Sequence, residues 1–238
     1  MPDVDWGNAP AGPAELYAQF PSEVAASTVI RLEEVRSIEA DATSAIRAAM
    51  AAAGARPHGL AFRMKSPAST ARKIQSKLLR SNNVAALAVA DRLTDLLRYT
   101  ALTKTSTEVV PAARATVGKL VDQGWQVVEA EHSFIAGNPY KGLHVLLRHP
   151  ASNLVIELQF HTDRAQHLKD ISHLDYERER DDAEPVEVRA AAHARMVKLW
   201  SGVRLPSGID GLVVDGVRVN AKVYPNPYKT TEQKGRTS

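Results

Sequence analysis

The chain has 238 residues, which is enough for one large domain with extensions. Its composition, 44% hydrophobic and 24% charged, is typical of a soluble globular protein, and the absence of cysteine excludes disulfides and thiolate metal sites. The formal net charge of +3 suits a phosphate-bearing substrate but is too small to indicate a nucleic-acid binder, whose basic residues would cluster.

The sequence also carries no apolar run of about 18 residues, the length that a membrane helix needs. Its first residues lack a charged segment followed by an apolar core, which is the pattern of a secretory signal. We therefore expect no membrane association, and a protein that acts in the cytoplasm.

In the N-terminal quarter, residues 1–13 hold Pro and Gly without periodicity and are expected to be loose. Apolar residues at three- and four-residue steps then predict a helix from Ala14 to about Ala53, ended by Gly54. Alternation in residues 59–65 predicts a strand with a cationic face.

The middle of the chain alternates between helices and strands. Ser66 and Pro67 are a good helix start, with a hydroxyl cap before a proline. This helix is expected to end near Arg80; the elements expected after it are a helix over 84–93, a strand over 95–103, a helix over 107–122 and a strand over 125–134.

Residues 138–162 predict two strands joined by a short loop, and the second strand alternates strictly. One face of it is apolar, whereas Glu157, Gln159 and His161 share the other. If Arg148 lies opposite Asn153, His144 faces Glu157 across the strands. Such a polar row is costly inside a protein unless each group has a partner, so it predicts the floor of a site.

Two more helices are expected over about 163–181 and from Pro185 to about Trp200, followed by a hairpin at Asp215 and Gly216 and a polar tail. The fold class is therefore α+β, a mixed sheet flanked by helices with an N-terminal helical extension. The expected division is 1–54 for the extension, 55–205 for the main domain and 206–238 for the C-terminal hairpin and tail.

Cations gather near the predicted helix start at Ser66. Arg63 and Lys65 precede it, and Ser69 and Lys73 lie one turn apart within it, so that together with the helix N-terminus they predict a polyphosphate site. Asp95, near Arg98, is a candidate ligand for Mg²⁺, which proteins bind through one or two carboxylates plus substrate oxygens.

Glu157 is the expected second carboxylate. In this interpretation the cations hold a triphosphate, Asp95 binds the metal, and Glu157 orients or deprotonates a hydroxyl nucleophile.

Four segments, "RMKSPASTARKI", the strand that begins at Asp95, "NPYKGLH" and "ELQFHT", followed by "HLDYE", resemble in order and spacing the RelA/SpoT-type synthetase domain. The resemblance covers roughly residues 58–180 and implies a nucleotidyltransferase-like sheet. It also implies Mg²⁺-dependent transfer of the β,γ-pyrophosphate of ATP to the 3′-hydroxyl of a purine nucleotide. No hydrolase segment of the "HD" type is visible, so the chain resembles a stand-alone, alarmone-producing synthetase.

The resemblance assigns a role to each candidate residue. Phosphates of ATP would be held by Arg63, Lys65, Ser69, Lys73 and Arg98, and Mg²⁺ by Asp95 and Glu157. Tyr140 would stack on the acceptor base, and Lys141, His144, Gln159 and His161 would lie around the acceptor.

Three positions depart from the family pattern: Arg98 and Thr100 stand where a small residue and an arginine are usual, and His161 stands where an arginine is common. Divergent branches of the family include toxins that modify adenine nucleotides or the 3′ end of tRNA. An effector of this kind, delivered into a target cell, is the first alternative, and an inactive nucleotide-sensing or interaction module is the second. A homo-oligomer and an antitoxin or immunity partner are compatible with either.

Structural roles are the alternative for each candidate residue. Glu157 could pair with Arg98, Lys65 or His144, and Asp95 could cap a helix or a strand. Charged residues on an edge strand also deter aggregation, which could explain Arg63 and Lys65. Ser69 and Lys73 could be an exposed helix face, Tyr140 plain packing, and His144 and His161 hydrogen-bonded structural histidines.

Overall fold

The structure, a computed structural model, describes residues 12–81 and 84–228. The expectations for residues 1–11 and for the tail beyond Tyr228 lie outside these ranges. Its helices are α1 (Pro13–Gln19), α2 (Ser22–Ala52), α3 (Pro67–Leu78), α4 (Ala86–Ala90), α5 (Ser106–Val121), α6 (Asp163–Ile171), α7 (His173–Arg180) and α8 (Val186–Trp200). Its strands are β1 (Arg56–His58), β2 (Arg98–Thr103), β3 (Gln126–His132), β4 (Leu143–Arg148), β5 (Val155–Thr162), β6 (Val213–Val214), β7 (Val217–Arg218) and β8 (Asn220–Ala221).

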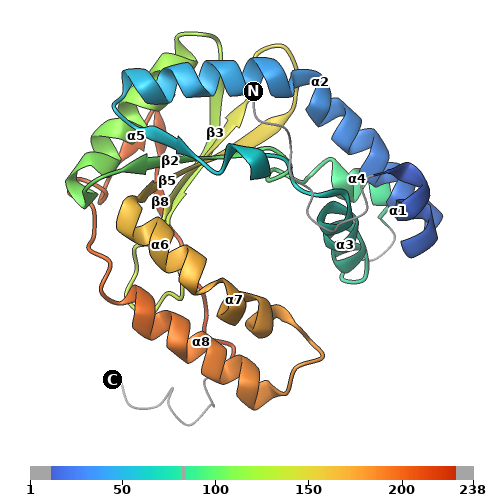
Figure 1. The fold of residues 1–238 in the computed structure, drawn as a ribbon. Helices are drawn as coiled ribbons and strands as arrows, with labels where there is room; N and C mark the ends of the chain where they lie inside the picture. Colours follow the sequence, from blue (N-terminus) through green and yellow to red (C-terminus); the bar gives the residue numbers. More distant parts are fainter. Residues whose placement is uncertain (1–11, 82–83, 229–238) are drawn as a thin grey trace.

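A mixed sheet forms the centre of the molecule, in the strand order β1-β2-β5-β4-β3-β8. Strand β2 runs parallel to β5 and β3 parallel to β8, whereas the other neighbours are antiparallel. Helices α2 and α5 lie on one side of this sheet, and α6, α7 and α8 lie on the other (Figure 1). The predicted fold class, a mixed sheet flanked by helices with an N-terminal helical extension, is confirmed.

The apolar face predicted for β5 is buried in the core, and on the other face Gln159 and His161 are buried too. Ile156, Leu158 and Phe160 are completely or almost completely buried, and they belong to one core together with residues of α2 and α5. The N-terminal extension therefore shares its core with the sheet. The last short strand, β8, also joins the sheet, so the expected C-terminal segment completes the main fold.

The pairing of β4 with β5 differs from the prediction by two residues. Arg148 lies opposite Val155 instead of Asn153, so His144 faces Gln159 and Leu146 faces Glu157. Since side chains alternate with a period of two, this shift keeps the polar row on the predicted face.

Residues 59–65 do not form the predicted strand. Gly59 takes a left-handed conformation (φ 61°) and turns the chain into a short 3₁₀ helix over Leu60–Phe62, after which Met64 alone makes a bridge, to Leu97. The period-two pattern was misleading: in the expected apolar row of Leu60, Phe62 and Met64, Phe62 is exposed and only Met64 is buried. As a result, Arg63 and Lys65 do not share a cationic face.

Two predicted helices are each divided. The helix expected over 14–53 breaks at Phe20 and Pro21, because a residue before proline avoids the helical conformation and Phe20 is extended. The helix expected over 163–181 breaks at Ser172, which ends α6 and precedes α7. The predicted hairpin is confirmed: Asp215 and Gly216 both have positive φ between β6 and β7.

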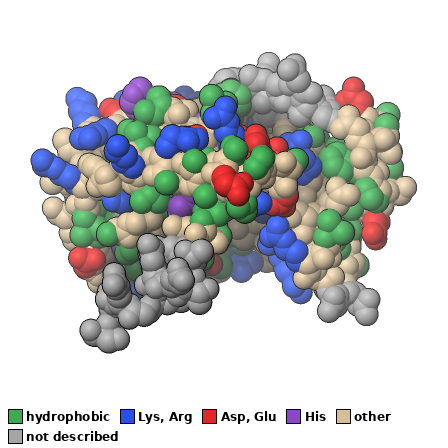
Figure 2. All heavy atoms as spheres, turned by 90° about the horizontal axis from the view of Figure 1, so that it is seen from below, with side chains coloured by type: hydrophobic (Ala, Val, Ile, Leu, Met, Phe, Trp, Pro, Cys, Tyr) green, Lys and Arg blue, Asp and Glu red, His purple; other side chains and the backbone are tan. Residues whose placement is uncertain are grey.

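On the face seen in Figure 2, the Lys and Arg side chains are interspersed with hydrophobic and acidic ones rather than joined into one patch. No helix in the described ranges combines the length and the apolar character needed to cross a bilayer.

Candidate active site

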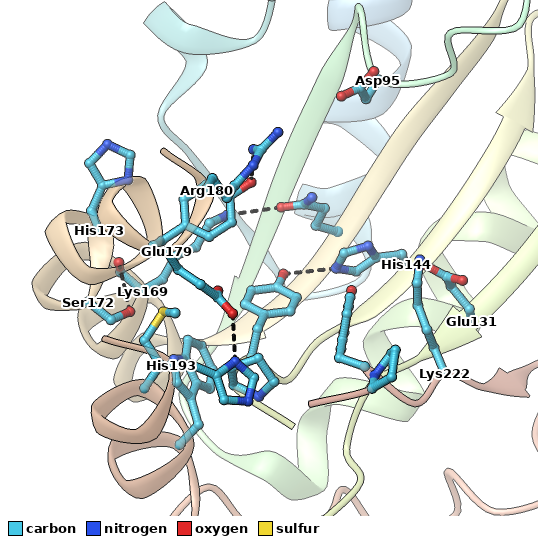
Figure 3. A pocket seen from close by; sticks show the side chains of 18 of the residues that line it. Asp95, Glu131, His144, Lys169, Ser172, His173, Glu179, Arg180, His193 and Lys222 are labelled. Atoms are coloured by element: carbon cyan, nitrogen blue, oxygen red, sulfur yellow. Dashed lines mark hydrogen bonds and ion pairs between the residues drawn. The ribbon is translucent and has the colours of Figure 1, made fainter. Parts of the chain in front are cut away.

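A cavity of about 960 Å³ opens on the polar face of the sheet. It is bounded by the strands, by α6, α7 and α8, and by the segment that follows β8 (Figure 3). The predicted site residues that line it are Lys73, Asp95, Arg98, Tyr140, His144, Glu157 and Gln159. The structure therefore brings the two predicted carboxylates into one cavity.

Asp95 is held by two lysines. Its carboxylate lies 3.1 Å from Lys65 Nζ and 2.6 Å from Lys73 Nζ. Burial alone would raise the pKa of Asp95, but the two ammonium groups outweigh it and lower that pKa to about 2. Asp95 is consequently an anion at neutral pH, at the centre of a cationic cluster.

Local sequence explains how this cluster forms. Ser66 caps α3 as predicted, since its Oγ accepts a hydrogen bond from the Ser69 backbone N–H, and Pro67 is the first helical residue. Lys73 then lies almost two turns along α3 and reaches Asp95 from there. Lys65, directly before the cap, reaches the same carboxylate from the other side of the turn.

Glu157 has a histidine partner. Its Oε1 lies 3.0 Å from His144 Nδ1, so the structural pairing considered for Glu157 is present, with His144 as the partner. Burial raises the pKa of Glu157, but hydrogen bonds from His144 and Gln159 and the charge of Arg98 outweigh it and lower the pKa to about 2. Such a weak base is better suited to accepting a hydrogen bond from a hydroxyl, or to binding a cation, than to removing a proton unaided.

Tyr140 is fixed by two histidines and a tryptophan. Its hydroxyl lies 2.8 Å from His144 Nε2 and 2.7 Å from His161 Nε2, and its ring packs against Trp200 at 5.1 Å between centroids. Burial raises the pKa of Tyr140 well above its usual value and lowers that of His161 well below its own, so both are neutral at pH 7. The structure thus holds the Tyr140 ring at the cavity wall in one orientation.

Gly142 makes this convergence possible. A Cβ at this position would lie 2.6 Å from His161 Cε1, 2.8 Å from the Tyr140 hydroxyl and 3.0 Å from His144 Nε2. The first two distances are shorter than real Cβ contacts and the third is tighter than most, so a larger residue at this position would push the rings apart.

The remaining predicted residues lie outside the lining of the cavity. Arg63 is buried and its Nε donates to Glu39 of α2 at 2.5 Å. Ser69 accepts from Arg72 on the exposed side of α3, and buried Lys141 donates to the backbone carbonyl of Val203. Lys65 reaches the site only through Asp95, and His161 only through Tyr140.

Sequence reasoning missed several polar residues of the cavity. Lys169 of α6 donates to Gln159 Oε1 at 3.1 Å, Lys222 pairs with Glu131 at 2.5 Å, and Glu179 lies 2.6 Å from His193 Nδ1 (Figure 3). For Lys169 a signal existed: it follows Ala165 and Gln166, the buried residues of α6, by four and three positions and so shares their face. No comparable signal marks the residues on β3, α7 and α8 or Lys222 after β8, which meet only in the folded chain.

The described residues contain no group of three or more His, Asp or Glu side chains placed to hold a metal ion. This donor set still fits Mg²⁺, because that ion is commonly held by one or two carboxylates and by phosphate oxygens of the substrate. Asp95 and Glu157, both anionic and both in the cavity, remain the carboxylates that the sequence predicts as its ligands.

The fold and the site together define a mixed α/β protein whose sheet carries a large cavity, lined by both Asp95 with its lysines and Glu157 with its histidine. No family model matches the sequence, and no curated protein does.

Among solved structures, the chain is similar to small alarmone synthetase 1 from Bacillus subtilis bound to its product pppGpp. The identity is 16%, with 57% of this chain and 68% of that chain covered and a TM-score of 0.36. It is also similar to small alarmone synthetase 2 from the same organism (13% identity, 74% and 97% covered, TM-score 0.41). A third is a GTP pyrophosphokinase family protein from Streptococcus pneumoniae (18% identity, 55% and 66% covered, TM-score 0.37).

Proposed function

We propose that this protein is a pyrophosphokinase, which transfers the β,γ-pyrophosphate of ATP to the 3′-hydroxyl of a purine nucleotide. The observation that carries the proposal is the presence in one cavity of Asp95, within its two-lysine cluster, and of Glu157, anionic and fixed by His144. Phosphoryl-group transfer needs cations for the phosphates and an oriented nucleophile. The cluster around Asp95 contains the cations, and Glu157 can orient the nucleophile.

The donor binds on the side of Asp95. Lys73, which lines the cavity, would exchange the Asp95 carboxylate for phosphate oxygens of ATP, while Lys65 keeps its pair with Asp95, the residue that would hold Mg²⁺. Bound there with Glu157 as a further ligand, Mg²⁺ would neutralise the charge of the phosphates.

The acceptor binds on the side of Tyr140 and Glu157. The acceptor hydroxyl donates a hydrogen bond to Glu157, which aims its oxygen at the β-phosphorus of ATP. A bond forms between that oxygen and the phosphorus, the bond from the phosphorus to the α–β bridging oxygen breaks, and AMP leaves with the electron pair. Glu157 accepts the hydroxyl proton as the new bond forms, when the attacking oxygen has become acidic.

The test is an acceptor screen. The full chain is incubated with γ-labelled ATP, Mg²⁺ and one acceptor at a time: GDP, GTP, AMP, ADP or bulk tRNA. We expect a labelled purine nucleotide, and its loss in Asp95→Asn and Glu157→Gln variants that keep the wild-type circular dichroism spectrum. Label on tRNA instead would mean that the chain is an effector of the same fold, and no labelled product with any acceptor would favour an inactive nucleotide-sensing module.

A further inference from the structure

Four cations that line the cavity, Arg80, Arg98, Lys169 and Arg180, have no ion pair with a carboxylate among the described residues, and two of them, Arg98 and Lys169, lie over the part of the sheet that holds Glu157. Lys73 is paired with Asp95 and Lys222 with Glu131, but neither Lys169 nor Arg98 has a carboxylate oxygen within 4.0 Å among the described residues. Arg98 is exposed and can be hydrated, whereas Lys169 is half-buried and its ammonium group contacts the neutral amide oxygen of Gln159. A partly desolvated charge with only a neutral partner leaves the site short of an anion.

The two cations come from different elements and meet over the same part of the sheet. Arg98 of β2 lies directly opposite Glu157 in the parallel ladder, and Gln159, which holds Lys169, is the next residue of β5 on that face. With neighbouring strands about 4.8 Å apart and a rise of about 3.3 Å per residue, the Cα atoms of Arg98 and Gln159 are roughly 8 Å apart. An anion between the two side chains could therefore contact both.

We propose that Lys169 and Arg98 form an anion subsite that takes a phosphate group of the acceptor nucleotide. This inference rests on the proposed function, because it assigns the acceptor to the subsite beside Glu157 and leaves the Lys65–Lys73 cluster to ATP. It also assigns Arg98 to binding of the acceptor, whereas the sequence resemblance assigned it to the phosphates of the donor ATP.

The electrostatics of Lys169 support this placement. Burial and the charge of Arg98 lower its pKa to about 8, against the opposing effect of Glu157 on β5 and of Asp170 on its own helix. A bound phosphate would add a negative charge beside the ammonium group and raise that pKa. Below about pH 8 Lys169 is charged and binds an anion; above it, the affinity should fall.

Equilibrium binding to the full chain tests the subsite without requiring turnover. At pH 7, isothermal titration of GDP and ADP is compared with that of guanosine and adenosine. Loss of one charge-assisted contact in Lys169→Met should weaken binding of a diphosphate about tenfold or more and leave the nucleosides unchanged. Lys119→Met, which removes an exposed cation of α5 outside the cavity, is the control for net charge and should bind like wild type.

Equal diphosphate affinity in Lys169→Met and wild type would overturn the subsite. Should this variant lose its fold, wild-type protein labelled at lysine Cε gives a second measurement by NMR. The Lys169 pKa should then rise on addition of GDP but not of guanosine, and an unchanged pKa would overturn the subsite too.

The outcome separates this inference from the proposed function. Lys169-dependent binding without any transfer product would support the subsite and refute the pyrophosphokinase activity. Transfer with an acceptor KM unchanged in Lys169→Met would support the proposed activity and refute the subsite.

Discussion

His144 donates its Nδ1 hydrogen to Glu157 at 3.0 Å, although the residue opposite Glu157 in the β4–β5 ladder is Leu146. The contact is diagonal, and it is possible because Tyr140 holds the other ring nitrogen of His144. The position and the ionisation of Glu157 therefore depend on a neighbouring strand.

The first prediction concerns this contact. Replacing His144 with Asn should raise the pKa of Glu157 from about 2 toward 4.5, because the strongest of the effects that lower it is removed. Glu157 must be ionised to orient the acceptor, so the acid limb of the pH profile of kcat should move to higher pH. A limb that stays in place, with activity otherwise intact, would show that His144 does not control Glu157.

The second prediction concerns the close approach at Gly142. A methyl group there would clash with His161, Tyr140 and His144, so Gly142→Ala should lower the free energy of unfolding by about 1–3 kcal/mol. Transfer activity should fall as well, because the three rings must separate. The matched control is Gly118→Ala, where the added Cβ meets no atom within 4 Å in the helix α5. Urea unfolding of both variants decides, and equal stability of Gly142→Ala and wild type would contradict the geometry.

The third prediction concerns the largely buried ion pair between Arg63 and Glu39 of α2. Arg63 Nε donates to Glu39, whose carboxylate also accepts from Thr43, and Thr43 Oγ1 lies 2.7 Å from the hydroxyl of Tyr99 on β2. Arg63→Met would leave Glu39 without its cation and should cost about 3–5 kcal/mol of unfolding free energy.

The double variant Arg63→Met with Glu39→Leu removes both charges and should recover most of that loss. If the double variant in urea is as unstable as the single one, the pair does not account for the effect.

The fourth prediction concerns acid. The pKa of Asp95 is about 2 in the folded protein and near 3.8 in an unfolded chain, so this pairing stabilises the fold above about pH 4. The contribution, roughly 2 kcal/mol, is lost as the pH falls from about 4 to 2. The difference in unfolding free energy between wild type and Asp95→Asn should therefore shrink over this range. A constant difference would mean that the Asp95 carboxylate gains nothing from its lysines.

Much of this site was predictable from the chain because it depends on local patterns. Strict alternation placed Glu157 and Gln159 on one face of β5, and the Ser66–Pro67 start placed Lys73 on a helix beside Asp95. The register error of two residues kept every polar side chain on its face, so it changed partners without changing the site.

The predictions that failed concern side chains whose partners are set by the tertiary structure. Nothing near Arg63 in the sequence indicates that Glu39 would take its guanidinium into the core. Likewise, α6 has the composition of a solvent-exposed charged helix, and only the folded structure shows that Lys169 contacts Gln159 of β5. Pairings of this kind depend on contacts between residues far apart in the chain, which propensity and periodicity do not contain.

The central claim, that one cavity catalyses pyrophosphate transfer, is tested most directly by product stoichiometry. ³¹P NMR of wild-type protein with ATP, Mg²⁺ and the accepting nucleotide should show one AMP for each acceptor that gains two phosphates, and Glu157→Gln should form neither. Formation of ADP in place of AMP, or equal turnover in Glu157→Gln, would contradict the account.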